Sequence, residues 1–88
     1  MEISSGRPYT EDGDLRTFSV ENAQEEFVWH RDKERRRVTV LEGQAWQFQF
    51  EENIPMELKE GLKFIIPEMI YHRLIKGKTD LVLRIETR

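Results

Sequence analysis

The sequence contains no cysteine, and this absence removes one means of stabilising a small chain. With 88 residues, the chain has room for one domain with a thin hydrophobic core. Domains with thin cores are often stabilised further by disulfides, a bound metal ion or a partner subunit. Because disulfides are excluded here, a metal ion or a second copy of the chain remains as the additional source of stability.

Two groups of catalytic motif are also absent. There is no cysteine nucleophile, and the serines, at positions 4, 5 and 19, have no nucleophile motif around them. No glycine-rich loop of the kind that holds phosphates is present either. These absences disfavour hydrolysis through a nucleophilic side chain and nucleotide-dependent catalysis, and they leave open whether the protein is an enzyme.

Long apolar runs and an excess of positive charge are missing as well. No run approaches the roughly 18 apolar residues of a membrane span, and the N-terminus lacks the basic and apolar regions of a signal peptide. We therefore expect a cytoplasmic protein with no membrane partner. The formal net charge is -3 and basic residues alternate with acidic ones, so we expect no nucleic-acid partner and interpret residues 33–37 as a mixed-charge turn.

What the sequence does contain is a series of short segments typical of β-strands, with alternating or continuous apolar residues. The clearest is 45–50, in which Trp46, Phe48 and Phe50 fall on one face of a strand. The segments are 15–20, 27–29, 37–41, 45–50, 62–66 and 81–85. The pattern predicts one all-β domain over residues 15–88, an antiparallel sandwich or barrel, preceded by an N-terminal arm or loose hairpin over 1–14.

Segment 67–77 differs from the others. It has Pro67 at a position that suits a helix start, an acid directly after it, and Gly77 at the end, so propensity alone predicts a helix.

The spacing of glycine, proline and histidine in the same region resembles the second sequence motif of the cupin superfamily. Gly61 is followed by five residues, Pro67 and, five positions further on, His72. These three residues match the cupin pattern, and Met69 stands where the family has a second glycine.

The first cupin motif is matched less completely. His30 takes the place of its first histidine and Gly43 that of its closing glycine. Asp32 stands at the second histidine, Arg36 at the glutamate and Gln24 at the opening glycine. The resemblance covers roughly residues 27–85, with a degenerate first motif.

The resemblance implies a small cupin-type double-stranded β-helix, a jelly-roll-like barrel. It replaces the helix at 67–77 by a turn at Pro67 and a strand over 71–75. On that strand His72 and Leu74 face the interior, and Tyr71 and Arg73 face outward.

The same resemblance implies a candidate metal site. On a strand, His30 and Asp32 project from one face, and the cupin geometry brings His72 to them from a neighbouring strand. Two imidazoles and one carboxylate suit Fe(II), and also accept Mn, Ni or Zn. The alternative is that no cofactor is bound and both histidines are hydrogen-bonded interior side chains.

Arg36 bears on the choice between these alternatives, because a guanidinium cannot coordinate a cation. It can point away and leave a three-ligand metal site, neutralise Asp32 in a metal-free pocket, or help to hold an anionic ligand. Glu34 can supply the missing acid if a bulge shifts the strand register. Gln47 either lines a polar cavity or meets solvent, so the candidate ligand-binding residues are Arg36, Glu34 and Gln47.

The resulting functional hypothesis is a cupin-like barrel that binds a small-molecule ligand or a divalent metal. The alternative is a non-catalytic binding or assembly module without metal, with Tyr71 and Arg73 on the surface of a homodimer. The order of His30, Asp32 and His72, with Arg84 downstream, also resembles that of 2-oxoglutarate-dependent oxygenases, but the chain is too short for that family's surrounding strands.

Overall fold

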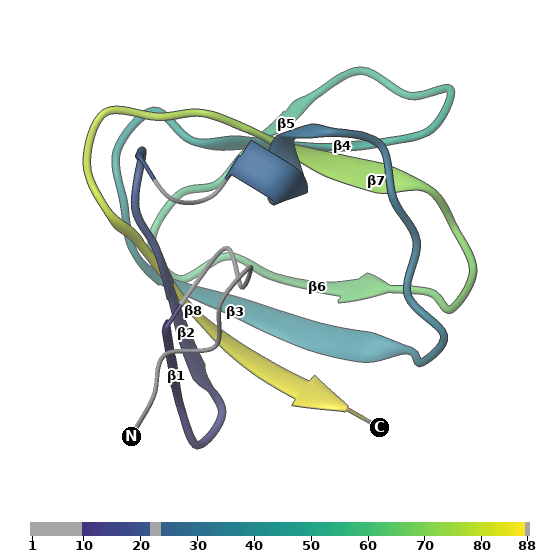
Figure 1. The fold of residues 1–88 in the computed structure, drawn as a ribbon, viewed down its shortest axis with the longest axis horizontal. Coiled ribbons are helices and arrows are strands. Elements are labelled where there is room, and N and C mark those ends of the chain that lie inside the picture. Colours follow the sequence, from purple (N-terminus) through teal and green to yellow (C-terminus); the bar gives the residue numbers. More distant parts are fainter. Residues whose placement is uncertain (1–9, 22–23, 88) are drawn as a thin grey trace.

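The computed structural model describes residues 10–21 and 24–87 as two antiparallel β-sheets that face each other (Figure 1). No α-helix occurs in this part of the chain, which confirms the all-β prediction. The strands are β1 Thr10–Asp12, β2 Leu15–Phe18, β3 Arg36–Glu42, β4 Gln47–Phe50, β5 Met56–Glu57, β6 Lys63–Ile66, β7 His72–Ile75 and β8 Leu81–Thr87.

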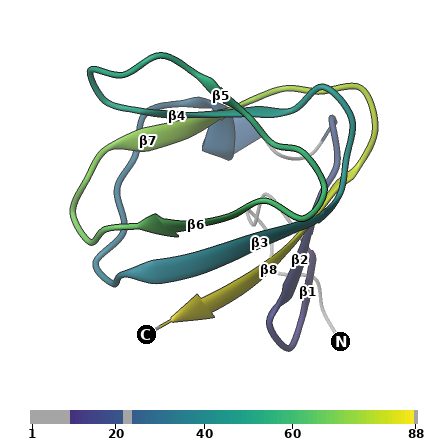
Figure 2. The ribbon, with the colours of Figure 1, turned by 180° about the vertical axis from the view of Figure 1, so that it is seen from behind.

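The larger sheet has the strand order β1-β2-β8-β3-β6, and the smaller has the order β5-β4-β7. Seen from either side, β4 and β7 lie across from β3 and β6 (Figure 2). The hydrophobic core fills the space between the sheets with alternate residues of the strands. Its buried members are Phe18, Val38, Val40, Trp46, Phe48, Leu58, Ile66, Leu74, Leu81, Leu83 and Ile85.

The N-terminal part of the sheet is a hairpin. β1 pairs with β2 on either side of a turn at Gly13, which has a φ of +63°. This conformation suits glycine, because a Cβ in the left-handed region crowds the backbone. Residues 1–9 of the predicted arm lie outside the described residues.

The predicted strand at 27–29 is wrong. Residues Gln24–Phe27 form a short 3-10 helix, η1, which packs beside β7. After it, His30 alone makes an antiparallel bridge to β7. An apolar run of only three residues cannot distinguish a short strand from a helical turn that buries one aromatic side chain.

At 67–77 the strand implied by the cupin resemblance is confirmed, and the helix expected from propensity is wrong. β7 pairs with β4, and its burial alternates, with His72 and Leu74 buried and Arg73 and Ile75 half-buried. The turn before it contains Met69 with a φ of +65°, at the position where the cupin motif has glycine. Pairing with β4 and burial of two side chains outweigh local helix propensity.

Trp46, directly before the start of β4, is fully buried. The loop that contains Gly77 passes close to its ring. The indole Nε1–H donates to Thr79 O at 2.6 Å. A Cβ on Gly77 would collide with the Trp46 ring and with Gln44 O, so glycine permits this close approach. The loop between β7 and β8 is thereby fixed to the start of β4.

Within residues 10–21 and 24–87, no helix has the length and apolar character needed to cross a membrane.

Candidate functional site

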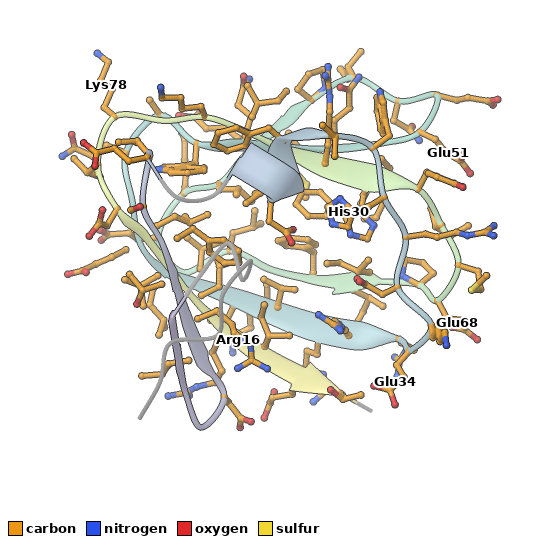
Figure 3. All side chains as sticks on the ribbon, viewed as in Figure 1. Arg16, His30, Glu34, Glu51, Glu68 and Lys78 are labelled. Carbon is orange, nitrogen blue, oxygen red and sulfur yellow. The ribbon has the colours of Figure 1, made fainter. Side chains whose placement is uncertain are left out.

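The candidate site begins with the backbone bridge between His30 and His72. His30 N donates to His72 O at 3.0 Å, and His72 N donates to His30 O at 2.8 Å. Residues paired in this way project their side chains to the same face of the sheet. The two imidazoles accordingly meet edge to face, with ring centroids 4.5 Å apart. Figure 3 shows His30 in the space between the two sheets.

Both imidazoles are held in one orientation by a backbone carbonyl. His30 Nδ1 lies 2.8 Å from Val28 O, and His72 Nδ1 lies 2.9 Å from Ile70 O. A carbonyl oxygen only accepts, so Nδ1 carries the proton in each ring and donates it. In a neutral ring, Nε2 is then left with a lone pair, the state required of a metal ligand.

The carboxylate of Asp32 faces the two imidazole rings. Its Oδ2 lies 3.4 Å from His72 Nε2, and its backbone carbonyl accepts a hydrogen bond of 2.7 Å from Met69 N. The turn before β7 thus fixes the segment that carries Asp32. Ligand atoms of His30, Asp32 and His72 all lie within 4.8 Å of one another, so the three predicted metal ligands are brought together.

A second carboxylate, which the sequence analysis missed, lies beside this cluster and contacts His30. Glu26 Oε1 in η1 lies 3.0 Å from His30 Nε2. The one available signal was the four-residue spacing between Glu26 and His30, which matters only if the segment turns helically. Because a strand was predicted at 27–29, the four-residue spacing gave no reason to expect a contact between Glu26 and His30.

The charges of the cluster perturb two pKa values. Burial lowers the pKa of His30, but the hydrogen bond and negative charge of Glu26, together with the hydrogen bond to Val28 O and the charge of Asp32, outweigh burial and raise this pKa above its ordinary value of 6.5. The hydrogen bond from His72, together with the charge of Arg36, holds the pKa of Asp32 below its ordinary 3.8.

The geometry fits a divalent cation. Each Nε2 faces a carboxylate oxygen, and two groups that offer only lone pairs repel, so a proton or a metal ion has to lie between them. Ligand atoms about 2.1 Å from a tetrahedral Zn ion lie about 3.4 Å apart. Donor atoms that now lie within 4.8 Å of one another therefore have to move together by up to about 1.4 Å to complete the site.

The predicted ligand-binding residues separate into two groups. Arg36 lines the cavity beside the cluster, and its Nε lies 3.8 Å from Asp32 Oδ2. Glu34 is exposed in the bend before β3, at the end of the molecule, and does not line this cavity (Figure 3). Gln47 alternates on β4 with the inward-facing Phe48 and does not line it either. β3 begins at Arg36, so Glu34 lies before the paired part of the strand, where its side chain is exposed.

Stability without metal is expected to depend on pH through Glu26 and His30. A raised His30 pKa adds stability that is fully present below pH 6.5 and is lost as the pH rises through the raised value. A lowered Asp32 pKa adds stability that is present above pH 3.8 and is lost as the pH falls through the lowered value. Both contributions are complete between these two pH values.

The contribution of His30 to the free energy of unfolding can be measured by urea unfolding in the presence of a chelator. Wild type and Glu26→Gln are compared at pH 6 and at pH 9. Wild type should lose more stability than the variant between the two pH values, because groups unaffected by the substitution cancel in the comparison. An equal loss in both proteins would show that Glu26 does not set the His30 pKa.

Comparison with known proteins supports the fold. The sequence matches no model of a known protein family and no curated protein. Among solved structures, the chain is similar to a cupin-2 domain-containing protein from Shewanella frigidimarina, at 25% identity and a TM-score of 0.60, over 93% of this chain and 78% of that one. A cupin domain from Bordetella pertussis is 17% identical, with a TM-score of 0.54, over 90% of this chain and 86% of that one. KdgF from a Halomonas species is 16% identical, with a TM-score of 0.56, over 99% of this chain and 84% of that one.

Proposed function

We propose that this small protein, a single domain with a cupin fold, binds one divalent metal ion through His30, Asp32 and His72. The observation that carries the proposal is the convergence of two Nε2 atoms and a carboxylate, with both Nδ1 atoms already used by backbone carbonyls. Carbonyls that orient metal-binding imidazoles in this way are a common feature of metal sites. Fe(II), Mn, Ni and Zn all accept this donor set.

Each residue near the ion has a definite task. His30 and His72 present fixed nitrogen donors, and Asp32 supplies negative charge. Glu26 stands outside this set of three ligands and pairs with His30, with its Oε1 3.0 Å from His30 Nε2. A bound divalent ion would supply a Lewis acid at the wall of the cavity, toward a small ligand that offers oxygen.

Metal uptake by untagged protein tests the proposal. After dialysis against each of the four metals, elemental analysis should find close to one ion per chain for at least one of them. At free metal about 100 times Kd, binding stabilises the folded state by about 2.7 kcal/mol. For a domain of this size that corresponds to a rise in Tm of roughly 10–20 °C.

Glu34→Gln provides the matched control, because it removes an exposed carboxylate from the neighbouring bend and should leave uptake unchanged. The absence of both metal uptake and a Tm increase with all four metals would overturn the proposal.

A further inference from the structure

A cavity of about 120 Å³ adjoins the candidate metal site and extends between the two sheets. One part of its wall is charged and the rest is apolar. The charged part comprises Arg16, Glu26, Asp32 and Arg36, with His72 beside them. The apolar part comprises Phe18, Val38, Phe48, Ile66, Leu74, Leu83 and Ile85. A wall of this kind suits a small molecule with one polar end.

Arg36 is the group in this wall whose hydrogen-bonding capacity is least used. Its Nε is buried, and among the described residues it has no hydrogen-bond partner. The ion pair with Asp32, at 3.8 Å, is too long for a hydrogen bond. A buried donor without a partner is costly, so an acceptor on a ligand beside Arg36 would be strongly favoured.

The charge balance of the wall indicates the sign of that ligand. Arg16 and Arg36 contribute positive charge, and Glu26 and Asp32 contribute negative charge, so these side chains balance. A divalent cation on His30, Asp32 and His72 therefore leaves the wall with an excess of positive charge. An anion between the cation and Arg36 removes the repulsion between them.

We propose that the cavity binds a small carboxylate, with its carboxylate group on the Arg36 guanidinium and its apolar body against Phe18, Phe48 and Leu83. The planar guanidinium matches a carboxylate in two parallel hydrogen bonds. A cavity of about 150 Å³ accommodates the six carbon atoms of benzene, so 120 Å³ sets a limit of about five non-hydrogen atoms for the body. The contribution of the cation rests on the proposed metal site, whereas the contact with Arg36 does not.

Butyrate is a suitable probe, and its uncharged counterpart butyramide is the matched control ligand. Titration into ¹⁵N-labelled protein, with and without Zn, reports binding through the Arg36 Nε–H signal. Butyrate should bind at least about tenfold more tightly than butyramide, because the amide lacks the charge that Arg36 recognises. From acetate to butyrate, affinity should rise about fourfold for each methylene as the apolar wall is covered.

Arg36→Met removes the guanidinium and keeps most of the side-chain volume, and Arg37→Met does the same at the exposed neighbouring position on β3. Butyrate affinity should fall at least about tenfold in Arg36→Met and remain unchanged in Arg37→Met. Zn affinity should be retained or improved in Arg36→Met, because a positive charge near the ion is gone.

The outcomes separate the two proposals. Equal butyrate affinity in wild type and Arg36→Met, or no butyrate binding to wild type at millimolar concentration, would overturn the carboxylate site. If wild type takes up no metal, the proposed metal function fails. The titration without Zn then decides the carboxylate site by itself, because loss of butyrate binding in Arg36→Met alone supports it.

Discussion

Replacing His72 with glutamine should lower the affinity for a divalent metal by at least about 100-fold. His72 is buried on β7 and its Nδ1 is already engaged with Ile70 O, so Nε2 is its one donor toward the ion. Glutamine offers a neutral amide oxygen, which binds Fe(II), Ni or Zn much more weakly than imidazole does. Titration calorimetry, or competition with a chelator of known affinity, measures the change.

Because His72 also stacks on Phe48, with ring centroids 5.2 Å apart, the substitution can affect folding as well as metal binding. Circular dichroism and urea unfolding in a chelator therefore have to show that the variant folds. Asp32→Asn is a second variant that keeps the shape of its side chain, and Glu68→Gln, at an exposed carboxylate in the turn before β7, is its matched control. Affinities within threefold of wild type in folded His72→Gln and Asp32→Asn would remove both residues from the ligand set.

The sequence predicted the fold correctly where the apolar pattern was long enough to show which face of a strand is buried. Trp46 and Phe48, two residues apart, are both buried, and Phe50 is half-buried and packs against the core. The pattern failed at 27–29, where three apolar residues are compatible with both a strand and the end of η1. At 67–77 the helix expected from Pro67 and Gly77 did not form, because helix propensity is local and the pairing of β7 with β4 is not.

The candidate site could be located from sequence because its histidines keep the spacing of a known family relative to Gly61, Pro67 and Gly43. The structure brings His30, Asp32 and His72 together. Glu26 could not be found in this way, since it reaches His30 through a helical turn that has no place in the motif. The orientation of Arg36 was left open, because a position on a strand does not determine where a long side chain ends.

Replacing Trp46 with alanine should cost about 3–5 kcal/mol of folding free energy, a large share of the roughly 5–15 kcal/mol that stabilises an ordinary domain. The side chain is 0% exposed, so its removal leaves a cavity between the sheets and deprives Thr79 O of its donor. Urea unfolding measures the loss. Trp46→Phe separates the two causes, because it keeps an aromatic ring and removes the Nε1–H.

Trp29 offers the matched control, since it is 43% exposed and packs under the guanidinium of Arg73, 4.7 Å from the ring centroid. Trp29→Ala should cost about 1 kcal/mol or less, the usual range for an exposed cation–π contact. Trp46 also contacts Phe27 of η1, with ring centroids 6.0 Å apart, so its loss should loosen the segment that carries Glu26. Trp46→Phe should therefore preserve metal affinity better than Trp46→Ala. Equal stability losses in Trp46→Ala and Trp29→Ala would contradict the placement of Trp46 at the centre of the core.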